Sequence, residues 1–95
     1  MEQESFDKLF ERFLKFSQTT FKDAKSESYL AKLEEETQEL KDHPNMEELA
    51  DCMMVLIGLS RFLPGDLKQT LAKKIEINEN RTWKKLSNGT YRHID

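Results

Sequence analysis

Hydrophobic residues recur at steps of three and four along most of this chain, and this spacing is typical of amphipathic α-helices. The first apolar stripe is rich in phenylalanine and consists of Phe6, Leu9, Phe10, Phe13 and Leu14. Ser5 precedes this stripe and can cap the helix. After a break around 19–28, a second helix is predicted from about Glu27 to Lys41. Its apolar face is made of Leu30, Leu33 and Leu40. Pro44 ends it, because proline cannot continue the helical hydrogen bonds.

The third stretch differs from the others, because it has almost no polar face. Asn45 is placed to cap a helix whose third position is Glu48, which is a capping-box pattern. From Leu49 to Leu63 nearly every residue is apolar, and a helix without a polar face is buried on every side. The other helices of so short a chain can hardly enclose it. We therefore predict that a partner subunit covers the rest.

A fourth helix is predicted after the turn at Pro64, with Asp66 as its cap. Its apolar stripe consists of Leu67, Leu71 and Ile75. After Trp83 the helical pattern dissolves. The residues Ser-Asn-Gly-Thr at 87–90 indicate a tight turn, and residues 91–95 are expected to form a short extended tail.

Composition agrees with a small helical domain. Hydrophobic residues make up 37% of the 95 residues and charged residues 35%, with only three Gly and two Pro. A chain of this length forms one domain at most. We predict an all-α bundle of about four helices, completed by oligomerisation. It is a single domain over residues 1–95, with a C-terminal tail at about 84–95.

Charge and cysteine content limit the expected partners and compartment. The net charge of −3 gives no general attraction to nucleic acid or to membranes. The start of the chain, with glutamate at positions 2 and 4, has no apolar signal region. The longest apolar run, 52–59, is too short to span a bilayer. Cys52 is the single cysteine, which excludes a disulfide framework and favours a reducing compartment. We therefore expect a cytoplasmic protein with no nucleic-acid or membrane partner.

Two pairs of acidic residues have the spacing of neighbours on one helix face. Glu36 and Glu39 form the first pair, and Glu48 and Asp51 form the second. The predicted helices that carry them are joined by a short break, so folding back would bring four carboxylates together. Like charges that close repel strongly unless cations separate them. Mg²⁺ prefers oxygen ligands and often bridges to substrate phosphates. The spacing therefore leads to the hypothesis of a metal site.

Each of these residues also has an ordinary explanation. Glu36 and Glu39 can belong to a charged helix flank, and Glu48 can serve the capping box. Asp51 is harder to explain, because it lies in an otherwise apolar helix and a buried, unpaired carboxylate is costly. A salt bridge from Asp51 to a lysine is the remaining ordinary interpretation. Taken together, the two pairs favour a metal site over coincidence.

Lys74, Asn78 and Arg81 form a third group. Their i, i+4, i+7 spacing places them on one face of the predicted fourth helix. Taken alone, such residues are usually a solvated basic face. Opposite an acidic metal cluster, however, they would suit a polyphosphate substrate, because the metal holds some phosphate oxygens and the cations hold others.

The same residues resemble a known family. The stretch 32–40, KLEEETQEL, followed by EELAD at 47–51, resembles the EExxE…ExxD signature of MazG-like, all-α nucleoside triphosphate pyrophosphohydrolases. Residues 72–83 are similar to the K…N..R.W run of the dATP/dGTP diphosphohydrolase branch, and residues 16–21 and 28–32 fit its lead-in. The resemblance spans about residues 13–94. The segment between the two acidic motifs is shorter than the family usually has, which predicts a tight hairpin.

The resemblance implies an activity and a set of site residues. The activity is Mg²⁺-dependent cleavage of a nucleoside triphosphate, with a purine dNTP expected, to the monophosphate and pyrophosphate; Mn²⁺ can substitute. The implied assembly is a homodimer or homotetramer. The implied metal ligands are Glu36, Glu39, Glu48 and Asp51. The implied catalytic residues, which orient or deprotonate a water, are Glu35 and Glu36. The implied substrate contacts are Lys74, Asn78, Arg81, Gln18 and Trp83.

Two alternatives stay open from the sequence. The first is a non-enzymatic helical oligomer that acts as a binding or regulatory partner, with its acidic residues merely solvated. The second keeps the fold and changes the substrate, for instance to dUTP, dCTP, phosphoribosyl-ATP or a damaged nucleotide, because nothing in the sequence reads the base. The metal dependence of pyrophosphate release separates the first alternative, and a panel of nucleoside triphosphates separates the second.

Overall fold

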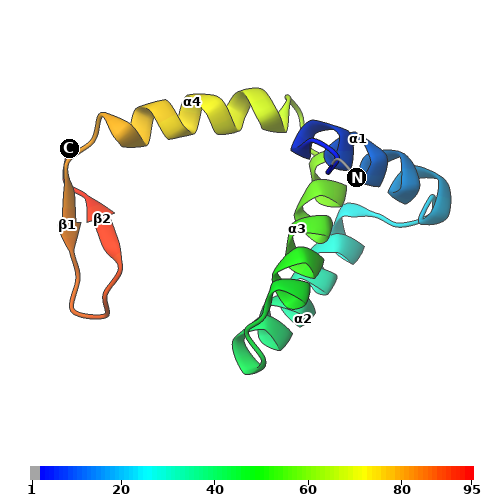
Figure 1. Ribbon diagram of the computed structural model, residues 1–95, viewed down its shortest axis with the longest axis horizontal. Coiled ribbons are helices and arrows are strands. Elements are labelled where there is room, and N and C mark those ends of the chain that lie inside the picture. The colour runs from blue at the N-terminus through cyan, green and yellow to red at the C-terminus, as the bar shows by residue number, and fades with distance from the viewer. Residues whose placement is uncertain (1–2) are drawn as a thin grey trace. The chain divides into compact units, whose positions relative to one another are not determined.

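The computed structural model describes residues 3–95, and helices dominate it (Figure 1). The elements are α1 (Phe6–Thr20), α2 (Ser26–Asp42), α3 (Met46–Ser60), α4 (Leu67–Glu79), β1 (Trp83–Lys85) and β2 (Tyr91–His93). The chain divides into two compact units, Met1–Pro64 and Gly65–Asp95. The predicted all-α class with about four helices is confirmed for the described residues, and the added strands form one small hairpin. None of the described helices has the length and apolar character needed to cross a membrane.

The helices begin where their capping residues predict. Ser5, Asn45 and Asp66 each accept a hydrogen bond from the backbone N–H three residues later, at 3.2, 2.9 and 3.0 Å. These bonds satisfy amide groups that have no partner inside the helix. The breaks between the first three helices are short, and the break at 43–45 makes a tight hairpin of α2 and α3.

The first unit is built on that hairpin. Helices α2 and α3 lie side by side along most of their length, and α1 packs against α3 (Figure 1). The buried apolar residues come from all three helices and are Phe10, Tyr29, Cys52, Val55 and Ile57. This core is small for a unit of this size. The apolar residues that it leaves exposed are therefore as informative as those that it buries.

A glycine sets the distance between α2 and α3 near the open end of the hairpin. Gly58 is buried, and a Cβ atom at this position would overlap the ring of Tyr29. The Tyr29 ring also lies 5.5 Å from the ring of Phe62. The guanidinium of Arg61 lies 4.6 Å from the Phe62 ring centre and donates to the backbone carbonyl of Phe21 at 3.2 Å. These contacts fasten the end of α3 to α2 and to the segment after α1.

Several predicted core residues are exposed. Phe6 and Leu9 in α1 and Leu30 in α2 are each more than 40% exposed, so these helices bury a narrower face than their stripes predict. The third helix was expected to be buried on every side. In this chain it buries only Cys52, Val55, Ile57 and Gly58. The physical reason is that two neighbouring helices cover only part of its surface.

The second unit consists of α4 and the β-hairpin. The strands pair antiparallel, with Trp83 opposite His93 and Lys85 opposite Tyr91. The turn between them contains Gly89 at φ +88°, a conformation that glycine adopts without strain. The tight turn at 87–90 is thus confirmed, and the extended tail expected at 91–95 is β2 over its first three residues, whereas β1 was not predicted. Strand β1 has three residues and no alternating apolar pattern, so it gives no sequence signal.

We predict that Gly58→Ala destabilises the protein, because the new methyl group must displace the Tyr29 ring. Overpacking of this kind costs about 1–3 kcal/mol, which outweighs the gain of about 1 kcal/mol from the better helix former. Urea unfolding followed by circular dichroism measures the change. In a Tyr29→Ala background the same substitution should be neutral or stabilising. An equal loss in both backgrounds would show that the ring contact is not the cause.

Candidate metal centre

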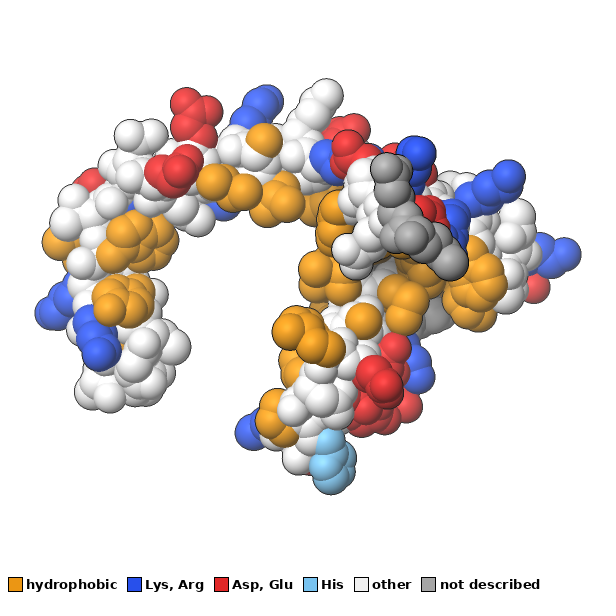
Figure 2. All heavy atoms as spheres, viewed as in Figure 1, with side chains coloured by type: hydrophobic (Ala, Val, Ile, Leu, Met, Phe, Trp, Pro, Cys, Tyr) orange, Lys and Arg blue, Asp and Glu red, His pale blue; other side chains and the backbone are white. Residues whose placement is uncertain are grey.

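The α2–α3 hairpin brings three of the predicted metal ligands together. Glu36 and Glu39 on α2 and Glu48 on α3 each offer a carboxylate oxygen, and these three oxygens lie within 4.8 Å of one another. Acidic side chains gather visibly on this hairpin (Figure 2). Two local facts produce the grouping. The i, i+3 spacing aligns the first two residues, and the short break at 43–45 returns the third to their level.

The burial of these carboxylates is uneven. Glu36 is 6% exposed, Glu48 is half-buried and Glu39 is exposed. The Oε2 atoms of Glu36 and Glu48 are buried, and within residues 3–95 neither has a hydrogen-bond partner. Leaving a buried carboxylate oxygen without a partner is costly. Three converging carboxylates with orphaned oxygens are a donor set that suits a hard divalent cation such as Mg²⁺ or Mn²⁺.

Mutual repulsion within this group of carboxylates shifts the pKa of one member, Glu39. The negative charge of Glu36 raises the pKa of the Glu39 carboxyl above its ordinary value, and burial and the charge of Glu48 act in the same direction. A charged helix flank does not describe Glu36, because a flank residue would be solvated. The ordinary explanation of Glu48 does hold in part, since its backbone N–H donates to Asn45. Because this cap uses only the backbone N–H of Glu48, the Glu48 carboxylate stays available.

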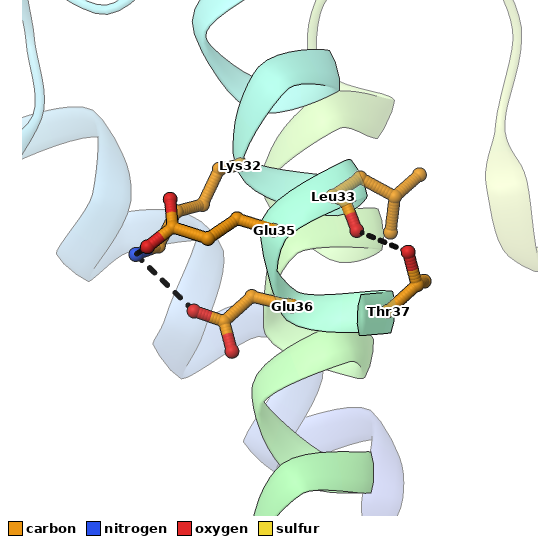
Figure 3. Close-up of polar contacts among 5 residues, drawn as sticks. All are labelled: Lys32, Leu33, Glu35, Glu36 and Thr37. Carbon is orange, nitrogen blue, oxygen red and sulfur yellow. Dashed lines mark hydrogen bonds and ion pairs between the residues drawn. The ribbon is translucent and has the colours of Figure 1, made fainter. Parts of the chain in front are cut away.

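Lys32 was not among the predicted site residues, yet it touches two acidic ones. Its Nζ lies 3.2 Å from Oε1 of Glu36 and 3.5 Å from Oε1 of Glu35 (Figure 3). The hydrogen bond to Glu36 and the charges of both glutamates raise the pKa of the Lys32 ammonium. The spacing of three and four residues was the signal that could have identified it. Glu35 itself is exposed and lies outside the group of three carboxylates.

Asp51 lies beside the group of three carboxylates but outside it. It is half-buried on α3 and, together with Glu36, lines a pocket, but it does not belong to the close group of three. Within residues 3–95 Asp51 forms no ion pair, so the alternative of a salt bridge to a lysine is not realised. Its predicted role as a fourth metal ligand stays a prediction.

The pocket beside the carboxylates is mainly apolar, and four of its lining residues are aromatic. It has a volume of about 500 Å³, and its aromatic lining consists of Phe13, Phe16, Phe21 and Tyr29. The charged side chains in its wall are Lys32, Glu36 and Asp51. The rings of Phe16 and Phe21 meet edge to face at 5.5 Å. Gln18, predicted to contact substrate, is exposed and does not line this pocket. The phenylalanine-rich sequence around α1 was a signal for this pocket, although it was interpreted as core.

The basic group lies in the second unit. Helix α4 ends at Glu79, so the prediction that Arg81 shares a helix face with Lys74 and Asn78 was wrong. The Arg81 guanidinium nevertheless donates to Oδ1 of Asn78 at 3.3 Å, and the Trp83 indole N–H donates to the Asn78 carbonyl at 3.0 Å. Asn78 therefore gathers Arg81 and Trp83 around the end of α4, while Lys74 lies exposed on the helix.

Cys52 lies next to the acidic residues on α3 and is buried. Burial raises the pKa of its thiol, and the charges of Glu36 and Asp51 add to this effect. The thiol is therefore held protonated at neutral pH. A buried, protonated thiol of this kind is an inert core residue rather than a nucleophile or a metal ligand.

We predict that Glu39→Gln raises the melting temperature in the presence of a chelator at pH 7. The raised pKa means that the folded protein holds a proton on Glu39 more tightly than the unfolded chain, so its charge costs stability as pH rises through the folded value. At pH 4 the carboxyl is largely protonated and the gain should shrink. Thermal denaturation at both pH values measures it. The control is Glu34→Gln, an exposed position on the same helix. A gain of equal size at pH 4 and pH 7 would contradict the assignment.

Comparison with known proteins places this chain. The profile of the dATP/dGTP pyrophosphohydrolase family matches residues 9–94. The dATP/dGTP diphosphohydrolase of Salmonella phage PMBT28 is 31% identical over 77 residues, which are 79% of this chain and 27% of that protein. The dATP/dGTP diphosphohydrolase of cyanophage S-2L is 35% identical over 69 residues, 68% of this chain and 65% of that protein. The chain thus spans less than two thirds of the length of either curated relative.

A solved structure gives the same placement. The MazG-like pyrophosphohydrolase of cyanophage S-2L, bound to dGDP and three catalytic Mn²⁺ ions per active site, superposes with a TM-score of 0.82. The two sequences are 26% identical, and the match covers 98% of this chain and 100% of that one. The MazG-like helical fold that the acidic motifs predicted is therefore confirmed, and the chain belongs to the dATP/dGTP pyrophosphohydrolase family.

Proposed function

We propose that this protein is a divalent-metal-dependent hydrolase that cleaves dATP or dGTP to the monophosphate and pyrophosphate. The observation that carries the proposal is the group of Glu36, Glu39 and Glu48, with two buried oxygens that lack a hydrogen-bond partner within residues 3–95. The chain belongs to a family named for this reaction, and the S-2L relative is described with dGDP and Mn²⁺. We expect Mg²⁺ as the ion, with Mn²⁺ able to replace it.

The carboxylates of the hairpin divide the chemical roles. Glu36, Glu39 and Glu48 would hold the metal, and Asp51, on the same wall as Glu36, would be a fourth ligand. A divalent ion held there would neutralise phosphate charge and lower the pKa of a coordinated water. Glu35 lies outside the close group, so its carboxylate is the one we assign to orienting the attacking water or accepting its proton.

The aromatic pocket is the site that we propose for the nucleobase. Aromatic side chains offer stacking surfaces that accept any base, and Phe16 and Tyr29 line a cavity large enough for a purine. The wall that carries Glu36 and Asp51 would place the phosphates at the metal ligands. The alternative of a non-enzymatic partner requires the acidic residues to be merely solvated. The burial of Glu36 argues against it.

The residues of the second unit stay predicted substrate contacts. Arg81 has a planar fork suited to phosphate, and Lys74 supplies a point charge. The side-chain oxygen of Asn78 already accepts from Arg81, so we propose that it orients the guanidinium. Trp83, which is 40% exposed, keeps a free ring surface for stacking.

We predict that the purified protein releases pyrophosphate from dATP or dGTP only when Mg²⁺ or Mn²⁺ is added. Asp51→Asn should lower this activity by at least about 100-fold, since a ligand oxygen and its charge are lost, while the helical circular dichroism signal is retained. The matched control is Asp23→Asn in the exposed turn after α1. Full activity in Asp51→Asn would refute its place in the site. No turnover of any nucleoside triphosphate in a panel would refute the enzymatic function.

We further propose that the protein is a homodimer or homotetramer. We predict that analytical ultracentrifugation at micromolar concentration finds a dimer or a tetramer. The apolar residues Leu49, Met53 and Leu56 of α3 are each more than 40% exposed, and hydrophobic side chains are visible along α3 and α4 (Figure 2). Exposed apolar surface of this extent marks an interaction site. Leu56→Glu should shift the protein to a smaller species, whereas Ser87→Glu in the exposed turn should not. A monomeric wild-type protein would contradict the proposal.

A further inference from the structure

The carboxylate of Glu36 is held from one side only. Its Oε1 lies 3.2 Å from the Lys32 ammonium, and its Oε2 is buried without a hydrogen-bond partner within residues 3–95. Figure 3 shows the second oxygen pointing away from Lys32. The Lys32 side chain is 51% exposed and that of Glu36 is 8% exposed. A half-solvated cation thus reaches in to a buried anion, and one oxygen of that anion is left over.

A simple helix-stabilising pair explains this contact poorly. On a helix surface, the favourable order of an i, i+4 pair places glutamate N-terminal to lysine. Here the order is reversed, because Lys32 precedes Glu36. Moreover, an ordinary pair joins two solvated side chains, whereas Glu36 is buried and neighbours two further carboxylates. The contact therefore acts on the carboxylate group, where orientation matters, more than on the helix.

We propose that Lys32 is a positioning residue of the metal centre, which fixes the carboxylate plane of Glu36 through Oε1 so that Oε2 is presented as the metal ligand. This inference rests on the proposed function, because it presupposes a metal at the group of carboxylates. Hydrogen bonds to the non-ligating atoms of metal ligands set their orientation, and their loss typically weakens metal binding about 10–100-fold. Lys32 is the donor that this structure offers to Oε1.

Because Lys32 is positively charged, the proposal can be tested by whether its removal weakens or tightens metal binding. A cation beside a metal site repels the metal, so removal of the ammonium by charge alone would tighten metal binding. Loss of positioning has the opposite effect, because the Glu36 carboxylate is then free to rotate and its oxygens are no longer preset. The direction of the change in metal affinity therefore separates a positioning role from a purely electrostatic or helix-stabilising one.

The experiment is a calorimetric titration of the full-length protein with Mn²⁺ alone, without nucleotide. We expect Lys32→Met to bind Mn²⁺ about 10–100-fold more weakly than wild type. Lys41→Met, which removes the same charge from an exposed position near the end of the same helix, should bind as wild type does. Lys32→Arg can still donate to Oε1 and should bind more tightly than Lys32→Met. Circular dichroism confirms the fold of each variant.

The outcomes are distinct. Lys32→Met binding Mn²⁺ as tightly as wild type, or more tightly, overturns the positioning role and leaves the proposed metal centre intact. Equal weakening in Lys32→Met and Lys32→Arg, or in Lys41→Met, also overturns it, because the effect would then not depend on a donor at Oε1. If wild type binds no Mn²⁺, the metal centre of the proposed function fails, and this inference fails with it.

Discussion

The burial of one carboxylate, that of Glu36, is the constraint on which the rest of this structure depends. A carboxylate that is 6% exposed needs partners, and the hairpin supplies one ammonium and two more carboxylates. Three carboxylates that converge in this way repel one another, and a bound cation relieves that repulsion while all three stay ionised. The folded hairpin therefore retains electrostatic repulsion among these three carboxylates. That unrelieved repulsion is the physical basis of the metal centre that we propose.

The hairpin is held at both ends of the group of carboxylates, and neither contact uses a carboxylate side chain. At one end, the Asn45 cap and the three-residue break set how α3 returns along α2. At the other end, the missing side chain of Gly58 lets the Tyr29 ring close against α3. Glu36 lies two helical turns from Tyr29, between these two fixed points. The positions of the carboxylates are thus consequences of a helix cap and of helix packing at the two ends of the hairpin.

The sequence predicted what depends on neighbours along the chain. The caps at Ser5 and Asn45 and the grouping of Glu36, Glu39 and Glu48 follow from local spacing and a short break. What it could not predict depends on packing between helices. The degree of burial of Glu36, the exposure of Leu30 and the aromatic pocket are set by which faces meet. Arg81 was misplaced for a local reason, because the helix ends before it without a proline or glycine to mark the end.

The relation between Lys32 and the carboxylates explains why the chain does not satisfy its own acidic cluster. One ammonium offsets one of three negative charges, and it reaches Glu36 from the exposed side, at Oε1. The repulsion that remains is visible in the raised pKa of Glu39. A second lysine placed among the carboxylates would reduce this repulsion and stabilise the fold. Its ammonium would also occupy the position that a metal ion needs. In the proposed site, this contact from the exposed side orients Glu36 through Oε1 and leaves the converging oxygens available. The repulsion that the hairpin retains in this way lowers its stability, and the same converging carboxylates form the divalent-ion site that we propose.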